Sequence, residues 1–386
     1  MAIALIRAII AAADKDRDEM TVLLIHGEPA AVIAPYGHEP RPGAAAEISF
    51  DQTAPPEARL VLSLPVLPVR RHGVIEGHDG DVLVCASVGP AGEVAAVWTT
   101  PDGKEAATST TVSAARASFP EPTAAWPVAA RITVHAPELA AVTRIAGLAL
   151  AHLTVQPMPG GRFLVAGARC RWRPDGPDRN AVLYDADGHV VSEHVLGDGI
   201  AHVLATSTGQ VWVGYFDEGI YGNYGWGRAE SEEPVGTYEI VRFSPGLEAA
   251  WHYPKYTEVG PWDAVSDCYA LNVDDTCTWA CYYSDFPVVR IRDGAVTGWH
   301  NDIRDTSALA VAGSRVALFG GYGPDRDRLA LAELSADRAE PAGEHRVVLP
   351  DGKPFPQVTR VIGRGSHLHF LTGTSWYQLD VDDIPA

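Results

Sequence analysis

The second half of the chain alternates short apolar runs with turn sequences at regular spacing. Four such runs follow one another between residues 200 and 253, and four more between residues 268 and 300. The runs are rich in β-branched and aromatic residues, and they are separated by Gly, Pro, Asp and Ser, which is typical of strands joined by tight turns. Trp279 in the second group occupies the place of Trp212 in the first. The pattern therefore predicts a repeated unit of four strands.

Further copies of this unit are recognisable on both sides. One spans residues 308–349, a shorter one ends at residue 381, and another lies upstream between residues 161 and 196. Four strands in every roughly 40–65 residues are typical of the blades of a propeller. We therefore predict an all-β fold, a β-propeller with six or seven four-stranded blades around a central channel, formed by residues 1–386 as one domain.

The first 150 residues follow the pattern less clearly. Strands are predicted at 21–26, 32–36, 82–88 and 94–99. Because the last unit is incomplete, and an open sheet edge is a liability, we expect a strand within residues 20–36 to pair with it and close the ring. Residues 1–19 favour a short helix, with an export signal as the alternative. Residues 106–127 are rich in Ala, Ser, Thr and Pro, which indicates a surface insertion or linker.

One stretch carries a resemblance to known propellers. The sequence Thr-Gly-Gln-Val-Trp-Val-Gly at 208–214 resembles repeats of sensor-protein ectodomains and of lactonase-like or NHL-type propellers. The resemblance covers the blade pattern of about residues 155–386 and includes no catalytic motif. It implies membership of the β-propeller superfamily, and a propeller fold by itself implies no function.

Composition and charge limit the classes of partner. The 386 residues are 46% hydrophobic and 20% charged, and the formal net charge is −19. Such an acidic surface repels phosphate backbones and anionic lipids, so we expect neither nucleic acid nor membrane as a partner. The five cysteines include no CxxC pair, which favours reduced thiols and a cytoplasmic location. The expected partner is a small molecule, or a protein or peptide.

Binding residues are expected on one face of the disc. In a four-stranded blade, the loop between the second and third strands lies on the same face as the connection between blades. The predicted loops of this kind are long, above all residues 217–237, and long loops on a rigid scaffold are where binding residues concentrate. Glycines alternate there with Tyr221, Tyr224 and Trp226. This segment is either a platform for a ligand or a plug over the channel mouth.

The ends of second strands in four units combine aromatic and charged residues. We predict that they form one ligand-binding surface on the long-loop face. Its members are Arg171, Arg173, Asp217, Glu218, Tyr221, Asn223, Tyr224, Trp226, Tyr283, Asp285 and Tyr322.

Three aspartates indicate a different chemistry. Asp198, Asp267 and Asp305 each precede the first strand of a unit, and first strands line a propeller channel. Together these carboxylates are candidates to bind a divalent cation, and the alternative is that each caps a turn. Ligand binding through the long loops is thus the leading function. The alternative is a metal-assisted hydrolase or lyase with its active site at the channel mouth. No GxSxG, Walker or HExxH motif assigns catalytic residues, so whether the protein is an enzyme stays open.

Overall fold

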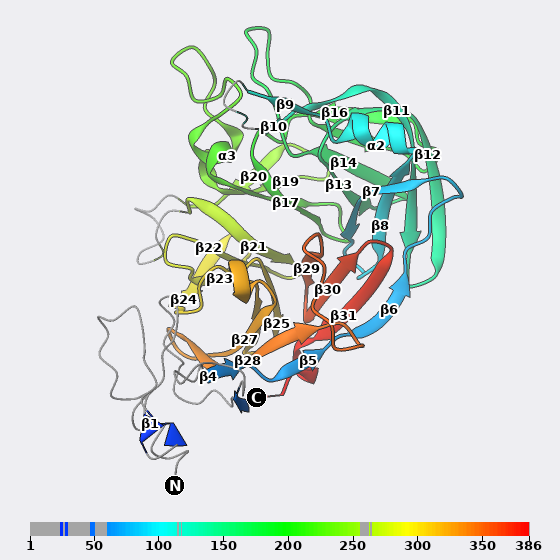
Figure 1. The fold of residues 1–386 in the computed structure, drawn as a ribbon. Helices are drawn as coiled ribbons and strands as arrows, with labels where there is room; N and C mark the ends of the chain where they lie inside the picture. Colours follow the sequence, from blue (N-terminus) through cyan, green and yellow to red (C-terminus); the bar gives the residue numbers. More distant parts are fainter. Residues whose placement is uncertain are drawn as a thin grey trace.

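The described part of the protein is a β-propeller. The computed structural model describes residues 60–254 (apart from 114, 115 and 117), 262 and 265–385, with short strands at 24–25, 28–29 and 47–50. Within these residues, six four-stranded antiparallel units stand around a common centre (Figure 1). The fold class predicted from the strand pattern is confirmed.

The blades are numbered here in chain order, and each is given from its inner to its outer strand. Blade one holds β7 (Val82–Val88), β8 (Val94–Thr99), β11 (Thr123–His135) and β12 (Leu139–Leu150); blade two holds β13 (Leu153–Met158), β14 (Arg162–Gly167), β15 (Ala181–Tyr184) and β16 (Val190–His194). Blade three holds β17 (Ile200–Ala205), β18 (Val211–Tyr215), β19 (Ile240–Phe243) and β20 (Ala249–His252); blade four holds β21 (Asp267–Val273), β22 (Thr278–Tyr283), β23 (Val288–Arg292) and β24 (Ala295–Trp299). Blade five holds β25 (Ala308–Ala312), β26 (Arg315–Phe319), β27 (Arg328–Leu334) and β28 (Ala339–Val348); blade six holds β29 (Arg360–Arg364), β30 (His367–Thr372), β31 (Ser375–Asp380) and β6 (Arg70–Val74).

Shorter elements complete the description. Outside the blades lie the strand pairs β1 (Leu24–Ile25) with β2 (Glu28–Pro29), β3 (Glu47–Phe50) with β4 (Leu60–Ser63), and β9 (Thr110–Val112) with β10 (Ser118–Pro120). β5 (Val66–Pro68) runs parallel to β28, and the helical elements are α2 (Pro101–Ala107), α3 (Asp217–Tyr221), η1 (Val235–Tyr238), η2 (Gly323–Asp325) and η3 (Val381–Asp383).

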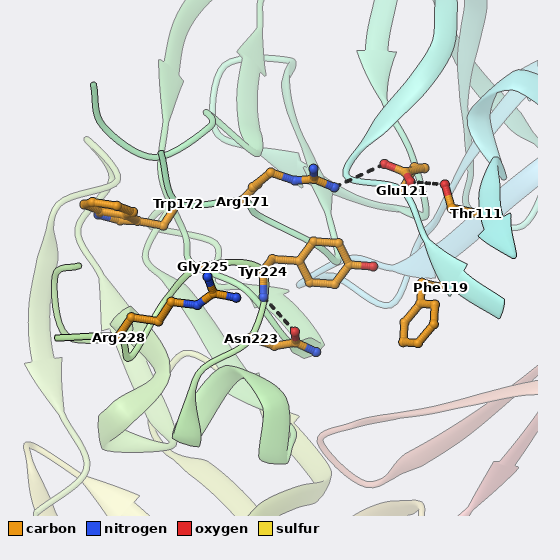
Figure 2. A pocket seen from close by; sticks show the side chains of 9 residues that line it. All are labelled: Thr111, Phe119, Glu121, Arg171, Trp172, Asn223, Tyr224, Gly225 and Arg228. Atoms are coloured by element: carbon orange, nitrogen blue, oxygen red, sulfur yellow. Dashed lines mark hydrogen bonds and ion pairs between the residues drawn. The ribbon is translucent and has the colours of Figure 1, made fainter. Parts of the chain in front are cut away.

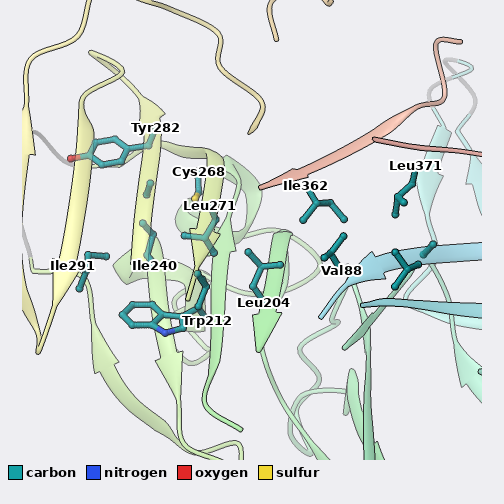
Figure 3. Close-up of a cluster of buried hydrophobic side chains, with 14 of the residues drawn as sticks. Val88, Leu204, Trp212, Ile240, Cys268, Leu271, Tyr282, Ile291, Ile362 and Leu371 are labelled. Atoms are coloured by element: carbon teal, nitrogen blue, oxygen red, sulfur yellow. The ribbon is translucent and has the colours of Figure 1, made fainter. Parts of the chain in front are cut away.

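The ring is held by contacts between the inner strands. β7, β13, β17, β21, β25 and β29 each contact the next in this order, and β29 also contacts β7. Leu204, Leu271 and Ile362 come from three different blades and belong to one buried cluster near the centre (Figure 3). The inner strands therefore enclose an axis that residues from every blade approach.

Burial decreases from the inner to the outer strands. All five residues of β18 are buried, because neighbouring blades cover both faces of the sheet. The outer strand β16 has no fully buried residue. A strand covered on both faces reads as a continuous apolar run rather than an alternating one. This burial explains why second strands were the easiest to recognise in the sequence.

The chain closes its ring with a different strand from the one expected. β6 pairs antiparallel with β31, with Val74 opposite Ser375, and so completes blade six (Figure 1). N-terminal closure was expected, but the range 20–36 was wrong. β6 reads Arg-Arg-His-Gly-Val, and an exposed outer strand needs no apolar pattern. Residues 1–19, expected to form a helix, lie outside the described residues, as does most of 20–36.

The segment 106–127 contributes to the long-loop face. It contains the end of α2, the β9–β10 hairpin and the first residues of β11. Among the described residues, no helix is long and apolar enough to cross a membrane. All five cysteines are unpaired in the structure.

Candidate functional site

A pocket opens on the long-loop face between the first three blades. We call this the loop face: it is the face at which the inner strands begin and from which the loops after the second strands emerge. The cavity measures about 490 Å³. Blade one lines it through the β9–β10 region, blade two through the loop after β14, and blade three through the loop after β18 (Figure 2). Its residues, the loop-face pocket, are Thr111, Phe119, Glu121, Arg171, Trp172, Asn223, Tyr224, Gly225 and Arg228.

A buried arginine supports the base of this region. Arg169 is 4% exposed and donates two hydrogen bonds to Asp198, Nε–Oδ1 at 3.0 Å and Nη2–Oδ2 at 2.8 Å. It also pairs with Glu218, and its guanidinium lies 4.4 Å from the ring centroid of Tyr224. Burial raises the pKa of the Asp198 carboxyl, and Arg169 offsets part of that rise. The predicted residues Asp198 and Glu218 thus hold an arginine in place.

Tyr224 joins the three loops that form the pocket. Its hydroxyl donates to the carbonyl of Pro120 at 2.6 Å, and its own carbonyl accepts from the Trp172 N–H at 3.0 Å. Next to it, Gly225 has a positive φ of 99°, and a Cβ there would lie 2.8 Å from the Trp172 carbonyl oxygen. Only glycine permits this close approach without strain. The Gly-aromatic pattern of the loop therefore serves tight contact between blades two and three.

The pocket presents cationic donors that the protein leaves without a partner. Arg171 Nε is buried without a hydrogen bond, and Arg171 reaches Glu121 only through Nη2, at 3.4 Å. Trp172 Nε1 is also buried and unpaired. The guanidinium of Arg228 forms no hydrogen bond or ion pair with any described residue. In Figure 2 the Tyr224 ring lies between Arg171 and Phe119. Arg171 therefore faces the carboxylate of Glu121 beside the Tyr224 ring, whereas Arg228 is exposed and lies on the other side of Tyr224 (Figure 2).

Not all of the predicted ligand-binding residues lie in this pocket. Arg171, Asn223 and Tyr224 line it, whereas Arg173 is exposed and pairs with Asp178, at 2.7 Å from Nε to Oδ1. The hydrogen bond to Asp178 raises the pKa of Arg173. Trp226 belongs to the segment predicted to be either a ligand platform or a plug; it is 3% exposed and donates from Nε1 to the Cys170 carbonyl at 2.9 Å. Trp226 therefore anchors its loop and does not line the pocket.

The other predicted aromatic residues gather over blades three to five. Tyr221 donates to Ser266 Oγ at 2.9 Å, and the hydroxyls of Tyr269 and Tyr322 are hydrogen bonded. The ring of Tyr283 packs edge-on against Phe286, which also contacts Tyr269. We call Tyr221, Tyr269, Tyr283 and Tyr322 the tyrosine rim. The predicted surface therefore divides into the loop-face pocket and this rim.

The predicted metal ligands are not brought together. The carboxylate of Asp198 accepts from Arg169 and from the Cys170 N–H, and Asp267 begins β21 beneath the tyrosine rim. Burial, and next the charge of Asp217, raise the pKa of Asp267 to about 6. Asp305 adopts a positive φ of 62° just before β25, and Asp285 lies in the short loop after β22. Among the described residues, the group with metal-like spacing is instead Asp185, Asp187 and His189.

That group belongs to a turn. Asp185 Oδ1 accepts the backbone N–H groups of Asp187 and His189, at 3.0 and 2.8 Å. These hydrogen bonds to the Asp185 carboxylate lower its pKa. The turn connects β15 to β16 on the face opposite the loop face. Its geometry is accounted for by hydrogen bonding within the turn.

Sequence reasoning missed six of the nine pocket residues: Trp172, Gly225 and Arg228 lie in loops where binding residues were expected, and the other three belong to blade one. Thr111, Phe119 and Glu121 come from the segment expected to be an insertion or linker. Glu121 accepts a hydrogen bond from the Thr111 hydroxyl, and it supplies the one carboxylate facing Arg171. A Phe and a Glu in a region of low pattern carry no local mark of a site. Their role depends on the β9–β10 segment of blade one reaching the loops of blades two and three.

Comparisons with known proteins find distant likenesses. A family model described as the YxzG family matches residues 258–378, which is less than half of the chain. No curated protein matches. Among solved structures, apo AztD from Citrobacter koseri is 12% identical, covering 77% of this chain and 82% of that one, with a TM-score of 0.36.

Two further solved structures resemble the chain to a similar degree. The WD40 domain of coronin from Toxoplasma gondii is 9% identical over 81% of this chain and 78% of that one, with a TM-score of 0.41. The calcium-binding protein regucalcin from Agrobacterium tumefaciens is 10% identical over 82% and 95%, with a TM-score of 0.38.

Proposed function

We propose that the protein binds a small anionic molecule with a flat ring in the loop-face pocket. The observation that carries this proposal is the pair Arg171 and Arg228, which have donors without partners among the described residues, beside the ring of Tyr224. An arginine fork matches carboxylate and phosphate oxygens, and an aromatic face suits a planar group. A protein or peptide ligand would have to present the same chemistry.

The size of the cavity suits such a ligand. Pockets for small molecules typically measure about 300–1,000 Å³, and this one measures about 490 Å³. A buried donor without a hydrogen bond costs free energy, which a ligand acceptor recovers on binding. In a protein with a net charge of −19, two cationic donors at one cavity also distinguish it from the surrounding surface.

Matched probes test the proposal by calorimetry. Phenyl phosphate and benzoate carry a ring and an anion, whereas benzyl alcohol carries the ring alone. We expect the two anions to bind and benzyl alcohol to bind at least about tenfold more weakly. Arg228→Gln should weaken anion binding about tenfold or more, because a hydrogen bond to a charged group contributes about 1.5–3 kcal/mol.

Arg173→Gln is the matched control for this experiment. Arg173 lies in the same loop as Arg171, but it is exposed, pairs with Asp178 and does not line the pocket. Its substitution should leave binding unchanged. Equal binding of benzyl alcohol and phenyl phosphate, or equal loss in both arginine variants, would show that the pocket does not select anions.

A second candidate function is a metal-assisted hydrolase or lyase at the channel mouth. The observation that favours it is the pKa of about 6 for Asp267, next to Asp217 and beneath the tyrosine rim. A carboxyl that titrates near neutral pH suits acid–base chemistry or a cation site. We expect Mn²⁺, Mg²⁺ or Ca²⁺ binding that strengthens as the pH rises through 6 and is lost in Asp267→Asn. Calorimetric titrations at pH 5 and 7.5 without heat from any of these cations would exclude the metal-assisted form.

A further inference from the structure

β29 carries two arginines whose surroundings differ. Arg360 and Arg364 are four residues apart in the inner strand of blade six, so both lie on the same side of the strand. Arg364 is 5% exposed and Arg360 is half-buried, and desolvation lowers the pKa of both guanidinium groups. Neither forms an ion pair with a described carboxylate. How each positive charge is compensated therefore depends on the hydrogen bonds it makes.

Arg364 is fully satisfied by the ends of other inner strands. Nη1 donates to the carbonyls of Ala205 and Val273, both at 2.9 Å. Nε and Nη2 donate to the Val88 carbonyl, at 3.1 and 2.9 Å, and Nη2 also reaches Gln156 Oε1 at 2.7 Å. These acceptors come from blades one to four. A guanidinium has five N–H donors, and here every one has an acceptor, so carbonyl dipoles compensate the charge.

Arg360 has no such partners. It stands at the start of β29, nearer the loop face, and lines a cavity of about 160 Å³. Its guanidinium forms no hydrogen bond or ion pair with any described residue. The lining of the cavity is otherwise mostly apolar: Ala201, Val203, Leu204, Leu271, Ala308, Val361, Ile362 and Gly363, with His202 and Ser307. None of these lining residues therefore compensates the positive charge of Arg360.

The titratable neighbours of Arg360 are neutral at pH 7. Burial raises the pKa of the Cys85 thiol to about 12, so Cys85 is not a thiolate. Burial, and next the charge of Arg360, lower the pKa of His202 to about 4. The Nε2–H of His202 donates to the carbonyls of Cys268 and Tyr269, each at 3.1 Å. Arg360 itself stays protonated, because a guanidinium does not lose its proton at neutral pH.

We propose that the central channel binds a small inorganic oxyanion, of the size of phosphate or sulfate, through Arg360. The half-buried Arg360 has no partner among the described residues, so a bound oxyanion can take the place of water at its guanidinium through charge-assisted hydrogen bonds. The cavity of about 160 Å³ equals roughly five water molecules at about 30 Å³ each, which is room for a tetrahedral oxyanion with water. This channel site shares no residue with the loop-face pocket.

Thermal unfolding in increasing inorganic phosphate tests the proposal. An anion that binds only the folded state raises the unfolding temperature with its concentration. Wild-type protein should show this rise, and Arg360→Met should show a smaller one, to which only the loop-face pocket and the weak general effect of phosphate contribute. Without phosphate, R360M should unfold at the same or a higher temperature, since it carries no uncompensated charge. Calorimetry should show at least about a tenfold loss of phosphate affinity in R360M.

Two further variants separate this site from the rest of the molecule. Arg228→Gln alters the loop-face pocket, so it should keep the full channel response. Arg364→Met removes the donor for three carbonyls and Gln156, and should lose stability at every phosphate concentration. A response equal in wild type and R360M, or one lost in R228Q, would overturn the channel site.

A measurement on the wild-type protein needs no variant. Crystals soaked in selenate should show an anomalous peak beside the Arg360 guanidinium. An anomalous peak at this position supports the proposal. If the cavity shows no such peak at saturating selenate, the proposal is overturned. Because the loop-face pocket lies elsewhere, selenate found only between Arg171 and Arg228 would support the proposed function and refute the channel site.

Discussion

Two aromatic residues of the same loop differ in burial and therefore in role. Tyr221 and Trp226 are five residues apart in a glycine-rich stretch, yet Tyr221 is 66% exposed and Trp226 is 3% exposed. The indole N–H of Trp226 reaches the Cys170 carbonyl, whereas the Tyr221 hydroxyl reaches Ser266 at the rim. One of these residues therefore stabilises the fold, and the other remains available at the surface.

Substitution of Trp226 should change stability. Removing a buried aromatic side chain costs about 3–5 kcal/mol, so Trp226→Ala should lower the free energy of unfolding by that order. Trp226→Phe keeps most of the apolar area and loses the hydrogen bond, so the loss should be smaller. Denaturant unfolding measures both. Tyr221→Ala, at an exposed position, should stay within about 0.5 kcal/mol of wild type. A stable W226A protein would mean that Trp226 does not anchor the loop.

Among the elements, the short strand β6 closes the ring of blades. Its five residues complete blade six by pairing with β31, and they join the two ends of the described ring. An edge strand left open would expose unpaired backbone groups. Its polar sequence is compatible with this role, because an outermost strand is covered on one side only.

A disulfide across this closure should stabilise the protein. Val74 and Ser375 lie directly opposite each other in the β6–β31 pair. A disulfide between Val74→Cys and Ser375→Cys would close a loop of roughly 300 residues, for which chain entropy predicts several kcal/mol. The reduced form of the same variant is the control. We expect a higher unfolding temperature for the oxidised form. Identical temperatures in the two forms would argue against β6 as the closing strand.

At the scale of the whole molecule, buried histidines make stability depend on pH. Burial lowers the pKa of His202 to about 4 and that of His369 to about 3, from 6.5. The stability that depends on these histidines is fully present above pH 6.5, where both side chains are neutral in the folded and in the unfolded protein. It is lost as the pH falls, because only the unfolded chain then takes up the protons. The raised pKa of Asp267 acts in the opposite direction between about pH 4 and 6.

We therefore expect the free energy of unfolding to fall between pH 7 and pH 5. Each of the two histidines should account for about 2 kcal/mol at pH 5, since one pKa unit corresponds to about 1.4 kcal/mol. Denaturant unfolding at several pH values measures the slope. His369→Gln keeps an acceptor for the Trp376 Nε1–H but takes up no proton, so its slope should be smaller. An unchanged slope in H369Q would remove His369 as a cause.

Much of the architecture follows from the sequence alone. Strands such as β18 and β22 are covered on both faces, so they need continuous β-branched and aromatic residues that are visible locally. Strands that local pattern missed have a different character. β11 contains Pro127 among alanines, and β6 is polar, because contacts with neighbouring strands rather than residue preference hold them in place.

The candidate site was only partly accessible to the same reasoning. Sequence by itself determined that aromatic and charged residues follow the second strands, and hence that Arg171 and Tyr224 belong to the loop face. Only the tertiary structure decided that Glu121 faces Arg171 and that Trp226 is buried. It also decided that Arg364 is satisfied while Arg360 is not. Local preference reflects neighbours along the chain, whereas these pairings depend on ring closure, which brings together blades far apart in sequence.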